Sequence, residues 1–233
     1  MADAQVGAWI ATCVHAYRAH HHTTPATIGG TGWLDGLAID GKVVHDSAGP
    51  TGVNVQLFSA LLHQEKVVIA QIAVPEHTTE VTEVTHLLDR VDLTNTVVTA
   101  DAAHTIDPTA TYLAVTRNSY YCLPVKENQP KLLKAIVALM PKAAAGSAHH
   151  TTEERIGGHR VVREIWVVPA TGITFPKARQ VYRIRRQTYD LLGHRIAKEI
   201  VHGVTNLSPA GHASATPGPQ SWALGDRIQS PGS

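Results

Sequence analysis

The chain has 233 residues, of which 43% are hydrophobic and 17% are charged, and its formal net charge is +1. This length is enough to bury one substantial core. The near-neutral charge excludes the whole-domain basicity that marks many nucleic-acid-binding domains, although a local basic face can still bind a phosphate backbone.

The sequence carries no signal of secretion or of membrane insertion. The N-terminus lacks a basic segment followed by a long apolar run, and no stretch approaches the length that spans a bilayer. The two cysteines, Cys13 and Cys122, are isolated and form no CxxC motif. We therefore expect a soluble, cytoplasmic protein with reduced thiols and no membrane partner.

The first 33 residues predict a helix followed by a linker. Apolar residues recur at helical spacing over residues 3–17, behind Asp3 as a cap. Residues 20–32 are polar and include three glycines and a His-His-His run at 20–22. Consecutive histidines rarely converge on one metal ion, so we interpret this stretch as a linker.

Residues 37–74 predict three antiparallel strands joined by short polar turns. The apolar run at 37–39 stops at Asp40, and further runs follow at 53–62 and 67–74. Asp40 is therefore predicted to lie at the end of the first strand.

Alternating helices and strands are predicted over residues 78–139. A helix capped by Thr78 or Thr79 has Glu80 in its first turn, and its apolar stripe consists of Val81, Val84, Leu87, Leu88 and Val91. A strand at 96–100 then leads directly into Asp101. A helix at 108–117, a strand at 120–125 and a helix at 130–139 complete the series.

The remainder of the chain has a different character. Partly alternating runs at 161–168, 178–187 and 198–207 predict longer strands, as a β-rich insertion or continuation. From residue 208 onward the chain is rich in Pro, Gly, Ser and Ala without an apolar pattern, which predicts disorder for 208–233.

Asp40 and Asp101 are the candidate chemical residues. In a sheet of order 3-2-1-4-5 the first and fourth strands are neighbours, so the two carboxylates would share a divalent ion. Hard oxygen ligands suit Mg²⁺ or Mn²⁺, and such ions activate a water or a 3′-hydroxyl in phosphoryl transfer. Each aspartate alone is more often an ordinary turn residue, but the pair in this element order favours a metal site.

Three separated motifs occur in order: Ala-Ile-Asp-Gly-Lys at 38–42, Val-Val-Thr-Ala-Asp-Ala-Ala-His-Thr at 97–105, and Val-Lys-Glu-Asn-Gln-Pro at 125–130. Over residues 34–207 the chain resembles the DDE transposases of bacterial insertion sequences, most closely the ISAs type related to the H-repeat-associated proteins. The resemblance implies an α/β, RNase H-like mixed sheet flanked by helices, with a β-rich insertion from about residue 150 and an incomplete C-terminal part.

The same resemblance implies an enzyme that cuts and joins transposon-end DNA. Asp40 and Asp101 match the first two metal-binding carboxylates of the family, and Mg²⁺ or Mn²⁺ is the implied cofactor. Lys126, Asn128 and Gln129 match a motif on the strand beside them, with a role in DNA contact, in supporting the site, or in structure alone. The oligomeric state stays open, with a homodimer as one alternative.

Two further features have alternative explanations. The densest basic stretch includes Arg183, Arg185 and Arg186, which either line a phosphate backbone or form a solvated strand face. His104 lies three residues after Asp101. It either contacts the surroundings of that aspartate or is a surface residue at a helix N-terminus, and the surface position is the commoner case.

The chain departs from the family pattern at the third carboxylate. Family members carry it in a helix with the motif Arg-Gly-His-Trp-x-Ile-Glu-Asn, which this sequence lacks. Four glutamates precede the expected place without lying on a predicted helix: Glu153, Glu154, Glu164 and Glu199. Most of the family's helical N-terminal region is also missing, so residues 1–33 match only a remnant of it.

Residues 221–228 offer an account of the missing motif. With suitable synonymous codons, Ser-Trp-Ala-Leu-Gly-Asp-Arg-Ile read from the second base gives Arg-Gly-His-Trp-Ala-Ile-Glu. The hypothesis is a frameshift upstream, between about residues 207 and 220, that replaced the catalytic C-terminus. Two functions follow: a transposase that is catalytically defective, or a non-catalytic remnant that at most binds DNA.

Overall fold

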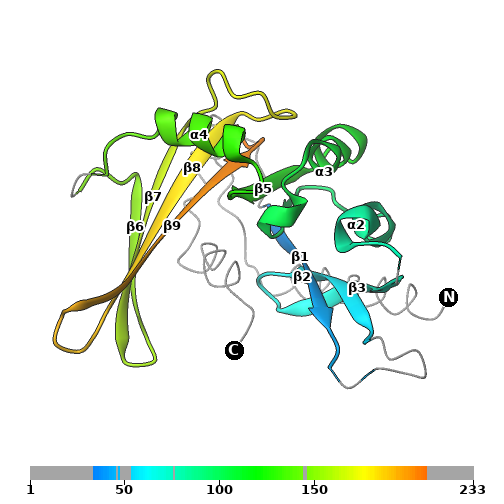
Figure 1. The fold of residues 1–233 in the computed structure, drawn as a ribbon, viewed down its shortest axis with the longest axis horizontal. Helices are drawn as coiled ribbons and strands as arrows, with labels where there is room; N and C mark the ends of the chain where they lie inside the picture. The colour runs from blue at the N-terminus through cyan, green and yellow to red at the C-terminus, as the bar shows by residue number, and fades with distance from the viewer. Residues whose placement is uncertain (1–33, 46, 48–53, 76, 144–145, 209–233) are drawn as a thin grey trace, which may run out of the picture. The chain divides into compact units, whose positions relative to one another are not determined.

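The computed structural model describes residues 34–45, 47, 54–75, 77–143 and 146–208 (Figure 1). The predicted N-terminal helix and linker, and the predicted disorder beyond residue 208, lie outside these residues. The chain divides into two compact units between Tyr121 and Cys122. This division falls inside strand β5 (Tyr120–Val125), and each unit is described separately below.

The first unit contains a mixed sheet of strand order β3-β2-β1-β4. Its strands are β1 (Asp35–Val43), β2 (Gln56–Leu62), β3 (Val67–Val74) and β4 (Thr96–Thr99). The first three strands pair in antiparallel fashion, and β4 pairs with β1 in parallel. The predicted adjacency of the first and fourth strands is therefore confirmed.

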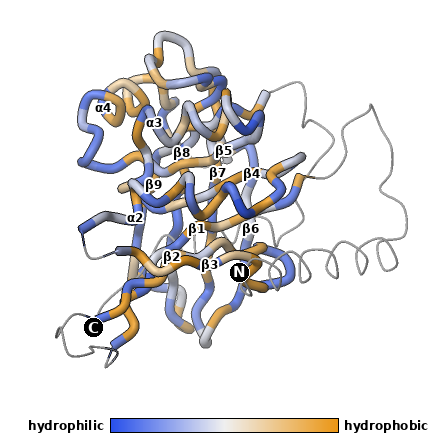
Figure 2. The backbone as a smooth tube through the Cα atoms, turned by 90° about the vertical axis from the view of Figure 1, so that its right-hand side faces the viewer, coloured by the Kyte–Doolittle hydropathy of each residue, from blue (hydrophilic) through white to orange (hydrophobic). Residues whose placement is uncertain are grey.

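Helix α2 (Glu80–Leu88) packs against β2 and β3 (Figure 1). Hydrophobic stretches, orange in Figure 2, occur along both β2 and β3. Val84, Leu87 and Leu88 are buried as the apolar stripe predicts. Val81 is only half-buried, whereas Glu83 is buried and its carboxylate pairs with the His86 imidazole at 2.7 Å.

The predicted helix at 108–117 is divided in the structure. A single 3₁₀ turn at Ala102–His104 follows β4, and α3 (Asp107–Thr111) continues into a π-helical turn at Tyr112–Thr116. Pro108 stands in the first turn of α3, where its missing N–H is not needed.

The second unit contains a sheet of order β5-β9-β8-β7-β6, in which each neighbouring pair is antiparallel. Its elements after β5 are α4 (Pro130–Leu139), β6 (His150–Ile156), β7 (His159–Pro169), β8 (Gln180–Tyr189) and β9 (Arg195–Thr205). Helix α4 contacts β9. Strand β6 was not predicted as a separate strand, because it pairs only with β7 at the sheet edge and shows no apolar alternation.

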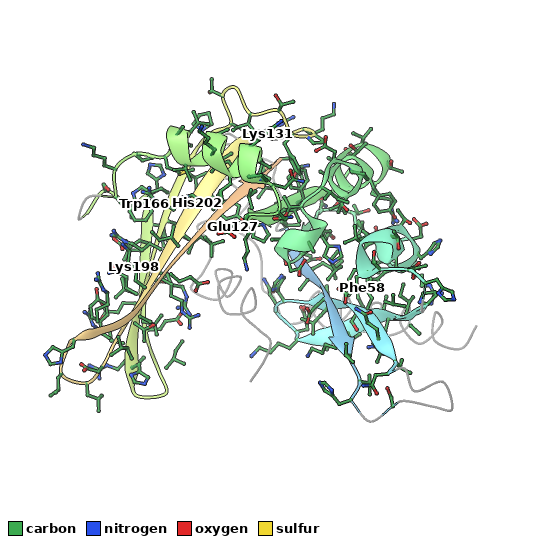
Figure 3. All side chains as sticks on the ribbon, viewed as in Figure 1. Phe58, Glu127, Lys131, Trp166, Lys198 and His202 are labelled. Carbon is green, nitrogen blue, oxygen red and sulfur yellow. The ribbon has the colours of Figure 1, made fainter. Side chains whose placement is uncertain are left out.

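The two faces of the second sheet differ in chemistry. One face carries a core cluster of Ile165, Tyr182 and Ile184. On this face Gly203 lies opposite Tyr182, and the aromatic ring occupies the space that a side chain at 203 would need. The other face carries Trp166, labelled in Figure 3, which is fully buried.

The described residues form a mixed α/β structure with large sheets and few helices. None of the helices in the described ranges has the length and hydropathy to cross a membrane.

Candidate functional site

Asp40 and Asp101 occupy equivalent positions on neighbouring parallel strands. The last parallel pair between β1 and β4 joins Ala38 to Thr99. Asp40 lies two residues after Ala38, and Asp101 lies two residues after Thr99. The backbone at Asp101 is still extended, with φ −74° and ψ 176°. Because side chains two residues apart in extended backbone point to the same side, the two carboxylates share a face. Both residues are exposed.

The prediction that Asp40 ends the first strand is wrong. Strand β1 continues to Val43, because its antiparallel pairing with β2 extends to Val43 opposite Gln56. Only the parallel pairing with β4 stops before Asp40. Asp40 therefore has the rigidity of a paired strand residue and still lies beyond the part of β1 that β4 covers.

A short turn fixes the carboxylate of Asp101. Its Oδ1 accepts a hydrogen bond from the Ala103 backbone N–H at 2.9 Å, so Asp101 caps the 3₁₀ turn that follows β4. A capping side chain has few accessible rotamers. The turn therefore holds this carboxylate in place without burying it.

His104 is buried, with 1% of its surface exposed, so the expected surface position is wrong. Its ring stacks on Phe58, labelled in Figure 3, with centroids 5.3 Å apart and planes inclined by 6°. Its Nε2 lies 3.9 Å from Asp101 Oδ1, as the alternative of a contact near that aspartate predicts. Burial lowers the pKa of His104 below its ordinary value, and the nearby carboxylates, first Asp101 and then Glu80, oppose that shift only in part.

Glu80 joins this cluster, and the sequence analysis assigned it only to the first turn of α2. Its Oε2 lies 3.8 Å from His104 Nε2, and its Oε1 accepts a hydrogen bond from the Gln56 side-chain amide. The carboxylate lies directly over the backbone of Gly41. The acidic first turn was visible in the sequence, but its tertiary partners come from three other segments.

Lys126, Asn128 and Gln129 lie in the turn between β5 and α4 in the second unit. Lys126 and Asn128 are exposed, and Gln129 is the half-buried N-cap residue of α4. Asp40 and Asp101 belong to the first unit.

The basic stretch of β8 is not a solvated face. Arg183 is 8% exposed, and its guanidinium lies 4.2 Å from the Trp166 ring centroid. Its Nη1 also donates to the Pro141 carbonyl at 2.9 Å. Arg185 forms two hydrogen bonds with the Glu164 carboxylate, at 2.6 and 2.8 Å. Arg186 is half-buried on the opposite side of the strand.

The Arg185–Glu164 pair predicts a large stability effect. The two side chains are 15% and 11% exposed, so Glu164→Ala leaves a largely desolvated guanidinium without its partner. We expect the free energy of unfolding to fall by about 3 kcal/mol. The matched control is Glu153→Ala on the edge strand, whose pair with Arg160 is more exposed and is expected to contribute about 0.5 kcal/mol. Equal losses in urea denaturation would contradict this prediction.

The stability of the second unit is expected to depend on pH through His202. Burial, and then the positive charge of Arg183 opposite it, lower the pKa of His202 from 6.5. A histidine with a lowered pKa in the folded state contributes stability that is present above its unfolded pKa and is lost as the pH falls toward the folded pKa. Wild type should therefore lose more unfolding free energy between about pH 7.5 and about pH 5.5 than His202→Gln does. If the unfolding free energies of wild type and His202→Gln change with pH by the same amount, this prediction is wrong.

A divalent ion fits the donor types at the two aspartates, because both offer exposed carboxylate oxygens from adjacent rigid positions. Within the part of the chain that the structure describes, no group of three or more His, Cys, Asp or Glu side chains is arranged to hold a metal ion. Two carboxylates alone would supply only part of the oxygen shell that such an ion takes.

The comparisons with known proteins differ in what they find. No curated protein matches the sequence. Among solved structures, the chain is similar to one described as a cryo-EM structure of a piggyBac transposase synaptic complex with hairpin DNA, at 11% sequence identity and a TM-score of 0.40. That match covers 76% of this chain and 34% of the other, so this chain spans about a third of its length.

The family comparison is the decisive one. The model of the transposase DDE domain matches residues 34–199, which include Asp40 and Asp101. The match covers well over half of the chain, and the chain therefore belongs to the transposase DDE domain family.

Proposed function

We propose that this chain is the RNase H-like core of an ISAs-type insertion-sequence transposase that has lost most of its strand-transfer activity. Its substrate would be transposon-end DNA, held near Asp40 and Asp101. The sheet of the second unit would be the β-rich insertion of that core. Residues 1–33 and 208–233 would be a remnant of the helical region and an out-of-frame tail.

The single observation that carries this proposal is the equivalence of Asp40 and Asp101 on parallel strands. Two carboxylates at matching positions past the last β1–β4 pair bring negative charge to one exposed face. Exposed carboxylate oxygens are the ligand type that Mg²⁺ and similar hard cations take.

Asp40 and Asp101 would hold Mg²⁺ or Mn²⁺ at this face. When bound, such an ion supplies charge stabilisation for phosphoryl transfer and lowers the pKa of a coordinated water or hydroxyl. The chain's own contribution is to orient the two carboxylates: β1 fixes the backbone of Asp40, and the Ala103 N–H fixes the carboxylate of Asp101.

The proposed defect follows from the missing third carboxylate. Glu153, Glu154, Glu164 and Glu199 all lie on strands, and three of them pair with arginines at 2.6–3.1 Å. None of the four therefore substitutes for a helix-borne catalytic glutamate. Reading the nucleotide sequence tests the frameshift: bases shifted by one over residues 221–228 should encode Arg-Gly-His-Trp, and any other reading rejects it.

The proposed DNA contacts differ between the two basic groups. Lys126 and Asn128 are exposed beside the N-cap residue Gln129, and we assign them to contact with a phosphate backbone. Arg183 and Arg185 are already engaged with Trp166 and Glu164, so we assign them to support of the sheet. Arg186 stays a candidate DNA contact.

A second candidate function is a remnant without catalysis that at most binds DNA. The strand positions of Glu153, Glu154, Glu164 and Glu199 favour it, because none of these carboxylates lies on a helix. Such a chain would occupy transposon ends and compete with an intact transposase.

A nicking assay with Mn²⁺ separates the two functions. Supercoiled plasmid carrying the element's ends is incubated with wild type or Asp101→Ala, and nicked circles are counted over time. The proposal expects slow, Mn²⁺-dependent nicking by wild type that Asp101→Ala removes. Equal background in both proteins would overturn the enzyme and leave the DNA-binding remnant.

A further inference from the structure

Glu80 contacts both segments that carry the candidate catalytic aspartates. On one side its carboxylate lies over Gly41, the residue next to Asp40. On the other side its Oε2 faces His104, whose Nε2 also faces Asp101. Glu80 is thus the side chain of α2 that connects β1 with the turn after β4.

The contact with β1 depends on a glycine. A Cβ atom at position 41 would overlap the Glu80 carboxylate, so the carboxylate occupies the place where another residue would carry its side chain. Gly41 pairs with Phe58 across β1 and β2. Since paired residues lie on one face, Phe58 and the Glu80 carboxylate lie on the same side of the sheet.

The contact with the Asp101 turn passes through His104. The imidazole stacks on the Phe58 ring, its Nε2 faces both carboxylates, and it is almost fully buried. Its Nε2 is nearly equidistant from Glu80 Oε2, at 3.8 Å, and Asp101 Oδ1, at 3.9 Å. A displacement of Glu80 would therefore be transmitted to the turn that holds Asp101.

We propose that Glu80 is a positioning residue that fixes the Asp101 turn relative to β1, and thereby sets the spacing of the Asp101 and Asp40 carboxylates. This inference rests on the proposed function, because the spacing matters only if the two aspartates bind one ion. Glu80 is placed to position rather than to bind, since one carboxylate oxygen is held by Gln56 and the other is turned toward His104.

An ordinary first-turn carboxylate gives a different expectation. Such a residue stabilises the helix N-terminus through the dipole alone and contributes about 0.5 kcal/mol. It requires neither the glycine opposite it nor the amide of Gln56. Its removal would weaken α2 and leave the turn at Asp101 unchanged.

The test compares Glu80→Ala and Glu80→Gln with Glu83→Gln, a matched control on the same helix whose carboxylate pairs with His86 instead. The first readout is the amide-proton chemical shift of Ala103 without metal, because this N–H bonds Asp101 Oδ1. Asp101→Ala gives the reference value for the broken bond. The second readout is the dissociation constant for Mn²⁺ from titration calorimetry.

We expect the Ala103 shift of Glu80→Ala to move toward the Asp101→Ala value, and its Mn²⁺ dissociation constant to rise about tenfold. Glu80→Gln, which keeps the size of the side chain, should fall between wild type and Glu80→Ala in both readouts. Glu83→Gln should match wild type. If Glu80→Ala and Glu83→Gln give the same Ala103 shift, Glu80 has no positioning role.

Gly41→Ala provides an independent route to the same displacement. The three atoms nearest to the added methyl group all belong to the flexible end of Glu80, so the fold should persist while the carboxylate moves away. The Ala103 shift should change as in Glu80→Ala, and adding Glu80→Ala to Gly41→Ala should change it no further. Additive changes would overturn the proposal. If wild type binds no Mn²⁺ through Asp101, the proposed function fails, whereas the Ala103 shift still decides the role of Glu80.

Discussion

If the tail is out of frame, as proposed, shifting its reading frame by one base should raise strand transfer by about 1000-fold over the present chain. A complete carboxylate set holds the metal ions that stabilise developing charge, an effect worth several kcal/mol, and about 4 kcal/mol corresponds to about 1000-fold in rate. The measurement is strand transfer of labelled transposon-end DNA into a plasmid with Mn²⁺. This is the largest effect that we expect for any change in this protein.

The control variants for this experiment change the two candidate metal-binding aspartates. In the restored chain, Asp40→Asn and Asp101→Asn should each return strand transfer to the level of the present chain, since each removes one anionic ligand. If the restored chain stays inactive while it folds and binds transposon ends, the frameshift does not explain the defect. If it is active and Asp101→Asn leaves that activity unchanged, Asp101 is not a site residue.

Gly203→Ala should cause the second large effect, a loss of about 3 kcal/mol in the free energy of unfolding. A Cβ atom at 203 would collide with the Tyr182 ring and lie 2.6 Å from the Leu123 carbonyl oxygen. The carbonyl belongs to the backbone of β5, which cannot move without breaking the β5–β9 pairing. The melting temperature should fall by about 6–12 °C, measured by circular dichroism.

Two comparisons isolate the cause of this loss. Ala197→Ser, an exposed substitution on the same strand, should change stability by less than about 0.5 kcal/mol. Combining Gly203→Ala with Tyr182→Ala should be less destabilising than the sum of the single changes, because the smaller residue removes one of the two collisions. Strict additivity would show that the ring is not the obstacle.

The sequence predicted the elements whose apolar residues follow one regular period. Strands β3 and β5 and helix α4 were predicted with their observed bounds, since each has a buried side and a sharp end at Pro75, Lys126 or Met140. Strand β6 was missed because neither of its faces is apolar. The π-helical turn after α3 was missed because it leaves no mark in the hydrophobic period.

The site was predictable only where the strand order alone brings its residues together. Asp40 and Asp101 could be paired from strand order alone, because parallel neighbours bring equivalent positions together. The roles of Glu80 and His104 were not predictable, since they depend on contacts with β2 and with Gly41, far away in sequence. The burial of the basic stretch of β8 was not predictable either. A run of arginines in a sequence does not show whether a guanidinium is already paired, as that of Arg185 is with Glu164.

The Glu80 carboxylate over Gly41 has a consequence for sequence variation in this family. A side chain at position 41 would compete for space with the Glu80 carboxylate of α2, independently of any turn conformation at that position. Among homologues, a side chain at position 41 should therefore occur together with a small residue at position 80. Such covariation would indicate that the side chains at positions 41 and 80 compete for the same volume.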